Sequence, residues 1–206
     1  MADHANASVV IETVPPAEMG AALAADAAKK AKGLVFPAGY VTLSFLGLEM
    51  ATGSFATMPI GMYAGTVTPF QLVRNWTWTL AGNLLGGIFF AWLLWFSLTK
   101  GGSTPPDSML KVISKTAEAK VSYIHYGMLG WCAAIGKGVL CNWFALGFEH
   151  TVVNMWLFPT AILSGANVSI YEWWVWNQIP VTIGNILGAM VLNGTLWYYT
   201  HTLQKE

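Results

Sequence analysis

Charged residues are scarce in this chain. Ten lysines and arginines and ten aspartates and glutamates make up only 10% of its 206 residues. A soluble domain carries about 25% charged residues, which it needs to cover its surface. Since 55% of the residues are apolar and the mean hydropathy is +0.51, we expect a lipid bilayer as the solvent. The zero net charge gives no indication of nucleic-acid binding, so no nucleic-acid partner is expected.

Cysteine is also scarce. Cys132 and Cys141 are the only two, which is too few for a disulfide scaffold. No histidine stands beside them at the spacing of a zinc site, so no metal and no cofactor are expected. Both cysteines lie in apolar surroundings, and we expect them to be small core residues.

Long apolar segments are what the chain has instead. They cover about residues 34–63, 76–98, 121–144, 151–163 and 173–199. A helix needs about 20 residues to cross the hydrocarbon core, so all but the fourth are long enough. Aromatic residues near the segment ends are expected in interfacial belts: Trp76, Trp78, Trp95, Trp173, Trp174, Trp176, Trp197, Tyr198 and Tyr199.

The chain therefore divides into three parts. Residues 1–33 are expected to be a surface segment, either a short amphipathic helix at the membrane or a solvated tail. Residues 34–200 are expected to form the transmembrane domain, and residues 201–206 a C-terminal tail. Within the domain, residues 100–120 read as a polar loop or a short surface helix that carries four lysines.

An internal repeat is the most informative feature. Gly47-Leu48-Glu49 resembles Gly147-Phe148-Glu149 at an offset of 100 positions, and Gly82-Asn83 resembles Gly184-Asn185 at an offset of 102. Each half thus has a glycine-broken segment with a glutamate, followed by a span with G-N-x-x-G, which indicates a duplication. Duplicated halves with broken helices are how many transporters build a substrate site near the bilayer midplane. The asparagines are expected to join helices, and the glycines to let them approach closely.

Polar side chains inside the apolar segments are candidates for function. Each costs roughly 1 to several kcal/mol in lipid unless it faces a partner or water. For the glutamates, a functional role and a structural bond stay equally open, since a carboxylate after a glycine break can cap freed backbone amides. The histidine is favoured as functional, because its proton comes and goes near neutral pH. The candidates are Glu49, Glu149, His150, Asn142, Asn154 and Lys137.

These motifs resemble those of the formate/nitrite transporter family. The stretch from Gly147 to Met155, followed by Pro159, resembles the family's G-F-E-H-S-x-x-N-M signature. Four further motifs follow the family order: Gly47-Leu48-Glu49 with Thr52, Asn75-Trp76 with Gly82-Asn83, Leu140-Cys141-Asn142-Trp143, and Ile179 to Ile186. The resemblance covers about residues 36–200. It implies an all-α integral membrane protein, an aquaporin-like bundle built from two repeats with broken helices.

The resemblance also implies a function and a pore. It implies a transporter and not an enzyme. The expected assembly is a homopentamer in the cell membrane, either a plasma membrane or a bacterial inner membrane. The expected substrates are small monovalent anions, formate or nitrite, which cross through a pH-sensitive, proton-linked pore. By motif, the substrate pathway is lined by His150 at its centre, its hydrogen-bond partner Thr52, and Asn154, Glu149, Glu49 and Lys120. Apolar constrictions fall at Phe36 with Tyr40 and at Met50 with Phe144.

The chain departs from the family pattern at two places. Family members have six spans, but here Lys32-Gly33 runs directly into what resembles the second span. After Trp143, the end of the fourth span and the start of the fifth are missing. A non-transporting fragment or accessory subunit of the same family is therefore one alternative. An intramembrane enzyme that uses Glu149 and His150 is another, although no third metal ligand is evident.

Overall fold

The computed structural model describes residues 45–141 and 148–202. The chain falls into two units, residues 1–48 and 49–206, and the architecture below is that of the second. All regular structure in the described residues is helical, as the sequence predicts. The surface segment expected at residues 1–33 lies outside the described residues.

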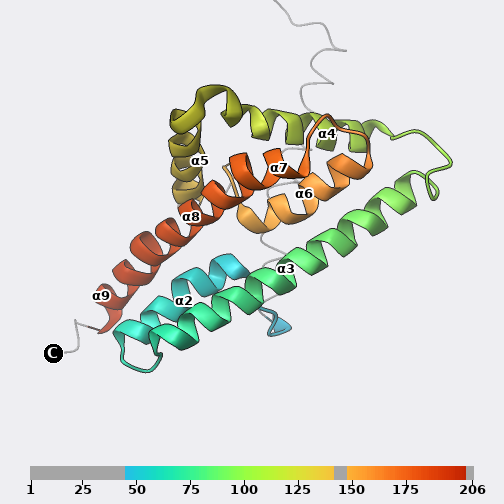
Figure 1. Ribbon diagram of the computed structural model, residues 1–206. Coiled ribbons are helices and arrows are strands. Elements are labelled where there is room, and N and C mark those ends of the chain that lie inside the picture. Colours follow the sequence, from blue (N-terminus) through green and yellow to red (C-terminus); the bar gives the residue numbers. More distant parts are fainter. Residues whose placement is uncertain (1–44, 142–147, 203–206) are drawn as a thin grey trace, which may run out of the picture. The chain divides into compact units, whose positions relative to one another are not determined.

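Two long helices and several short ones form the described part of the second unit, and Figure 1 shows their arrangement. The helix α3 has 30 residues, and a second long helix, Ile170–His201, is likewise long and apolar enough to cross a membrane. Two π-helical segments, η2 and η3, interrupt that second helix. In order, the elements are α2 (Ala51–Tyr63), α3 (Pro69–Leu98), α4 (Ser108–Val121), the 3₁₀ turn η1 (Ser122–Tyr126), α5 (Gly127–Cys141), α6 (Thr151–Leu163), α7 (Ile170–Trp173), η2 (Trp174–Gln178), α8 (Ile179–Leu187), η3 (Gly188–Thr195) and α9 (Leu196–Thr202).

The predicted boundaries hold for some segments and fail for others. The short fourth segment is α6, with the bounds that its apolar run predicts. The second segment begins seven residues before Trp76, since Thr68 and Gln71 form a capping box in front of Pro69. The long third span is wrong for the described residues. There the chain turns through η1 and Gly127, at a φ of 52°, which leaves α5 with only 15 residues.

The repeat is visible in the backbone. The half-helices α2 and α6 both have 13 residues and both contain a proline, Pro59 and Pro159. A glycine with positive φ follows each of them, Gly65 and Gly165. A capping box then opens each long helix, at Thr68 in the first half and Ser169 in the second. A half-helix therefore follows the expected glycine break in each half.

The growing offset between the halves has a structural cause. The half-helices start 100 positions apart, the caps lie 101 positions apart, and Asn83 and Asn185 lie 102 apart. One residue is added in the turn before the cap. The other is added where the second repeat contains η2 and the first has regular α-helix, because a π-turn takes up one extra residue in a helix.

Within the described residues, the close helix packing predicted at the glycines is present in the second half but not at the predicted glycines of the first. The helix α5 packs along α8, and a Cβ placed on Gly184 would lie 2.2 Å from the Ile135 carbonyl oxygen. The predicted close approach at Gly184 is therefore present. In the first half, a Cβ on Gly82 or Gly86 would meet no atom of the described residues within 4 Å, whereas Gly87 packs against the Met155 backbone.

Two expectations about burial are wrong. Cys132 is exposed, because it lies on the outward face of α5. Trp173, expected in an aromatic belt, is 5% exposed and packs with Phe158 in a cluster under α4 and α6. In an apolar helix, the sequence around a residue does not show whether that residue faces lipid or the protein interior.

Candidate functional site

Each half contains a break that an asparagine from the following long helix bridges. In the first half, Asn83 donates to the Glu49 carbonyl oxygen at 3.2 Å and accepts the Ala51 N–H at 2.9 Å. In the second half, Asn185 donates to the Glu149 carbonyl oxygen at 3.0 Å and accepts the Thr151 N–H at 2.8 Å. We call this arrangement the amide clamp.

The amide clamp satisfies one carbonyl oxygen and one N–H at each break. Non-helical backbone at membrane depth needs partners within the protein. Among the described residues, the asparagine amides bond the backbone at the breaks, and the glutamate carboxylates bind side chains instead. Within residues 45–141 and 148–202 the carboxylates therefore cap no backbone amide, whereas the asparagines do join helices as predicted.

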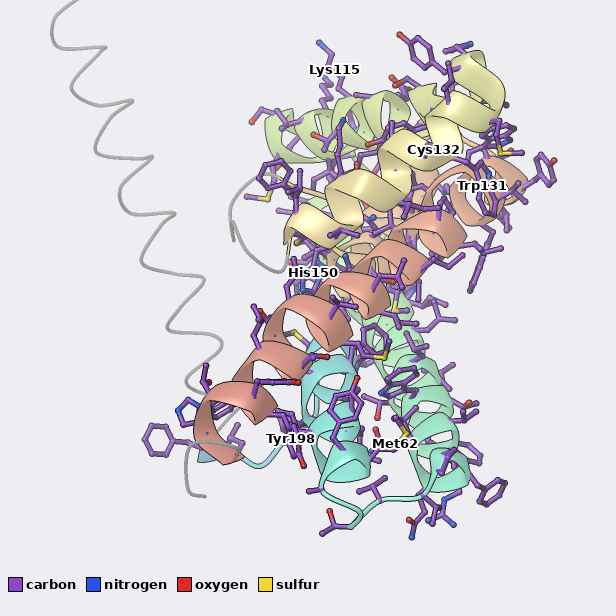
Figure 2. The ribbon with its side chains drawn as sticks, turned by 90° about the vertical axis from the view of Figure 1, so that its left-hand side faces the viewer. Met62, Lys115, Trp131, Cys132, His150 and Tyr198 are labelled. Carbon is purple, nitrogen blue, oxygen red and sulfur yellow. The ribbon has the colours of Figure 1, made fainter. Side chains whose placement is uncertain are left out.

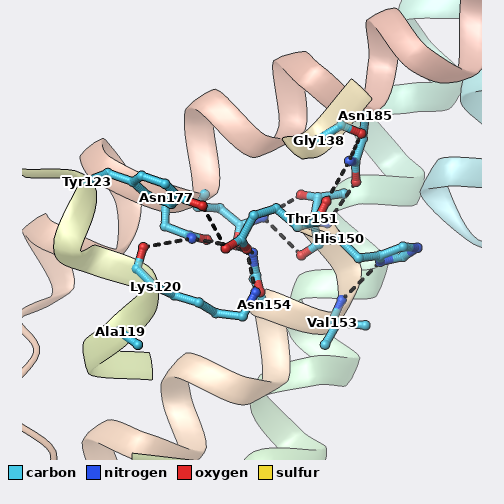
Figure 3. A network of polar contacts seen from close by, with 12 residues as sticks. Ala119, Lys120, Tyr123, Gly138, His150, Thr151, Val153, Asn154, Asn177 and Asn185 are labelled. Atoms are coloured by element: carbon cyan, nitrogen blue, oxygen red, sulfur yellow. Dashed lines mark hydrogen bonds and ion pairs between the residues drawn. The ribbon is translucent and has the colours of Figure 1, made fainter. Parts of the chain in front are cut away.

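The Glu149 carboxylate is the centre of a buried polar cluster (Figure 3). Glu149 is 5% exposed. Its Oε2 accepts from Lys120 Nζ at 2.5 Å, Asn154 Nδ2 at 3.1 Å and Asn177 Nδ2 at 3.3 Å. Its Oε1 accepts from the Tyr123 hydroxyl at 3.1 Å. A buried carboxylate of this kind is tolerable because it has both a counter-charge and hydrogen-bond donors.

His150 lies on the other side of the same break. It is the N-cap residue of α6, and its Nδ1 accepts the Val153 N–H at 3.3 Å. Its Nε2 lies 3.3 Å from the Thr52 hydroxyl of α2. Figure 3 shows the ring pointing away from Lys120 and Tyr123. In Figure 2, His150 lies between the end of the molecule marked by Lys115 and the end marked by Met62 and Tyr198.

The cap determines which nitrogen of the neutral ring carries the proton. An Nδ1 that accepts a backbone N–H has no proton of its own, so the neutral ring is protonated at Nε2. The Nε2–H then points toward Thr52 and can donate to its hydroxyl or to an acceptor that displaces it. In this geometry the imidazole presents a hydrogen-bond donor to the side where α2 and α6 meet.

Glu49 has a more open environment than Glu149. Its carboxylate accepts from the Ser54 hydroxyl at 2.6 Å, from Asn75 Nδ2 at 3.1 Å and from the Thr79 hydroxyl at 3.4 Å. Each of these donors is neutral. Within the described residues, Glu49 is exposed and lines a groove of about 630 Å³ that also contains Arg74.

The structure brings some of the predicted site residues together. Lys120, Glu149 and Asn154 form one cluster, while His150 and Thr52 form a second contact at the same break. Glu49 lies in the equivalent place of the first repeat, and Met50 is the N-cap residue of α2. The predicted constriction residues Phe36, Tyr40 and Phe144, and the candidate Asn142, lie outside the described residues.

Two residues of the cluster were not predicted. Tyr123 lies in the 3₁₀ turn that ends the predicted surface helix, and nothing in its sequence context marks it. Asn177 could have been found, because it stands 102 positions after Asn75 and so extends the second repeat match. Among residues 45–141 and 148–202, no three histidine, cysteine, aspartate or glutamate side chains are grouped so that they could hold a metal ion.

Comparison with known proteins gives consistent matches. Residues 6–145 and 144–199 match the family model described as formate/nitrite transporter, so the match begins earlier than residue 36. A probable formate transporter of Methanothermobacter thermautotrophicus is 30% identical, over 82% of this chain and 74% of its own length. The formate channel FocA of Haemophilus influenzae is 29% identical, over 81% of this chain and 72% of its own length. A solved FNT family ion channel superposes with a TM-score of 0.65 at 26% identity, over 78% of this chain and 72% of that one.

Proposed function

This chain belongs to the formate/nitrite transporter family of integral membrane proteins, and from that premise we propose that it conducts formate or nitrite along a path past His150. Its relatives are named as channels and transporters, which sets aside the intramembrane enzyme. The observation that carries the proposal is the contact between Thr52 of one repeat and His150 of the other.

The helix geometry at this contact favours an anion. Thr52 lies in the first turn of α2, and His150 is the N-cap of α6, so the N-terminal ends of both half-helices meet here. The N-terminus of a helix carries a partial positive charge from its aligned peptide dipoles. Two such ends, together with the Nε2–H of His150, lower the cost of moving an anion out of water.

Lys120 contributes to this proposal through its ion pair with Glu149. A buried carboxylate next to His150 would repel a passing anion, and the Lys120 ammonium neutralises that carboxylate. Asn154 and Asn177 hold the carboxylate in place. Lys120 thus keeps the neighbourhood of the path free of net negative charge.

Proton linkage is the second part of the proposal. Formate and nitrite are conjugate bases of weak acids, so an anion that gains a proton crosses an apolar constriction at lower cost. The proton would come from the imidazolium form of His150, which gives up its Nε2 proton to the anion and becomes the neutral ring; because Nδ1 is protonated in that form, its contact with the Val153 N–H must open during the step. We therefore expect flux measured across about pH 5 to pH 8 to change with pH in a way that depends on His150.

Flux in proteoliposomes tests both parts. With the whole chain reconstituted, His150→Asn keeps an N-cap side chain but removes the titrating ring. We expect it to lower formate and nitrite flux roughly 10- to 100-fold, the cost of one hydrogen bond to an anion, and to flatten the pH profile. His201→Ala, at an exposed histidine in α9, is the matched control and should leave flux unchanged.

The possible outcomes separate the proposals. If His150→Asn keeps its flux, the path does not pass this residue. If its flux falls while the shape of the pH profile stays, the proton relay is wrong. No flux from well-inserted wild-type protein would favour the alternative of a non-transporting fragment or accessory subunit.

We also propose a homopentamer with one path per protomer. In the described residues α3 buries only Leu72 and Ala91 of its 30 residues, and large apolar side chains such as Trp78 and Leu85 are 73% and 69% exposed. Such a surface needs lipid or a neighbouring copy against it. The mass of the particle in mild detergent, by light scattering, tests this, and a monomer or dimer would contradict it.

A further inference from the structure

The outward face of α4 has no role in the proposed path. The inward face of the helix buries Leu110, Ala117 and Val121; Ala117 and Val121 belong to a cluster with residues of α6 such as Phe158 and Ala161. On the outward side, Met109 is 55% and Val112 63% exposed. Lys111 and Lys115, one helical turn apart, are exposed beside them. The outward face therefore combines an apolar strip with a pair of lysines.

The two lysines on this face form no ion pair within the described residues. The two acidic residues nearby are engaged with backbone: Asp107 Oδ1 accepts the Leu110 N–H at 2.9 Å, and Glu118 Oε1 accepts the Asn167 N–H at 3.0 Å. Neither Lys111 nor Lys115 has an ion-pair partner in the part of the chain that the structure describes. Figure 2 shows Lys115 pointing away from the bundle. An anionic partner would complement this surface.

The position of α4 places that surface at the edge of the membrane. The apolar helix α3 ends at Leu98, and Trp92, Trp95 and Phe96 stand in its last two turns. The turn that follows packs on two of these rings: a Cβ on Gly102 would lie 3.3 Å from Trp95, and one on Gly101 3.2 Å from Phe96. Tryptophan and aromatic side chains of this kind mark the level of the lipid headgroups. Soon after this turn the chain enters α4, which packs over α6 (Figure 1).

We propose that the outward face of α4 is a docking surface for anionic phospholipid. Met109 and Val112 enter the boundary between headgroups and acyl chains, and the ammonium groups of Lys111 and Lys115 bind lipid phosphate. This is the arrangement of an interfacial amphipathic helix, in which apolar burial and charge attraction add. Free phosphate would satisfy the lysines but leave Met109 and Val112 in water, so the pairing of both features favours a lipid. The proposal depends on the membrane location of the chain and not on the anion path.

Lipid counting in nanodiscs tests the proposal. The whole chain is placed in phosphatidylcholine nanodiscs with a rising share of phosphatidylglycerol, and bound phosphatidylglycerol is counted by native mass spectrometry. A lysine near an anionic surface contributes roughly a fivefold change in affinity. We expect Lys111→Gln and Lys115→Gln each to weaken phosphatidylglycerol binding about fivefold and the double variant about 25-fold. The Lys111→Arg/Lys115→Arg variant should bind as the wild type does.

Two controls make the result decisive. Lys100→Gln removes one charge from the turn before α4 and should have little effect; a loss equal to that of Lys115→Gln would overturn the assignment to the α4 face. Met109→Ser/Val112→Ser should weaken binding with both lysines intact. Displacement of the lipid by inorganic phosphate, or unchanged binding in the double lysine variant, would also overturn it. A thermal unfolding curve confirms that each variant is folded.

Discussion

The two glutamates show how far the halves of this molecule have diverged. Both follow a break, both lie beside an amide clamp, and both accept from equivalent positions, Ser54 and Asn154 along the half-helix, and Asn75 and Asn177 in the long helix. Glu149 also accepts from Lys120 and Tyr123 and is buried, whereas Glu49 has neutral partners and is exposed within the described residues.

The difference separates a feature shared by both repeats from a feature specific to the second repeat. The amide clamp occurs in both halves with similar distances, so it belongs to the fold that the duplication supplied. The lysine–glutamate pair occurs in one half among the described residues, next to the one half-helix that begins with a histidine. We infer that the clamps maintain the breaks, while the ion pair adjusts the electrostatics around His150.

The largest effect is expected from removing the counter-charge in the second half. Lys120→Met leaves the Glu149 carboxylate buried without its ion-pair partner, which should cost about 3–5 kcal/mol of unfolding free energy. The measurement is unfolding of the purified protein in mild detergent. Lys115→Met, on the exposed side of the same helix, is the control. The double variant Lys120→Met/Glu149→Gln should regain most of the loss, and failure to do so would mean that packing of the lysine chain, not its charge, matters.

Intermediate effects are expected from the amide clamps. Asn185→Ala should cost more than Asn83→Ala, about 2–3 against about 1–2 kcal/mol, because a buried unpaired backbone group carries the full desolvation penalty. Asn185 is fully buried and also donates to the Gly138 carbonyl oxygen at 2.9 Å. Hydrogen exchange at the Ala51 and Thr151 amides reports the local opening of each break. Equal costs would show that the halves are equally dependent on their clamps.

The smallest effect is expected at the first glutamate. Glu49→Gln keeps an acceptor for Ser54 and Asn75, and at an exposed position it should change unfolding free energy by less than about 0.5 kcal/mol. Glu149→Gln is the matched comparison, since it leaves the Lys120 ammonium without its partner. A cost at Glu49 as large as that at Glu149 would remove the distinction between the two sites.

The sequence predicts the breaks and helix bounds of this structure better than it predicts the side-chain contacts. The repeat motifs locate both breaks and both clamp asparagines, because a duplication leaves glycine, glutamate and asparagine at matching positions. The apolar run of α6 gives its bounds, because the run ends where the helix does. The family motifs name His150 and Thr52, and their contact is present in the structure.

The sequence did not predict long-range contacts or which face of each helix is buried. Tyr123 reaches Glu149 only because η1 turns the chain after α4, and the same turn shortens the expected third span. The outward position of Cys132 and the burial of Trp173 depend on which face of each helix is covered. The change of offset from 100 to 102 shows that the second half has gained two residues. Only the structure shows that one of them lies in the π-helical segment η2.

The amide clamp has a consequence for how the protein is made. Each clamp joins a break to an asparagine more than 30 positions further along the chain, so a half-helix leaves the ribosome well before the residue that completes it. Until that long helix arrives, the break would expose unpaired backbone groups to hydrocarbon, which bilayers do not tolerate. The half-helix and its long helix must therefore enter the membrane as a pair. For biogenesis, the smallest insertable piece of this protein is one hairpin of a repeat and not a single helix.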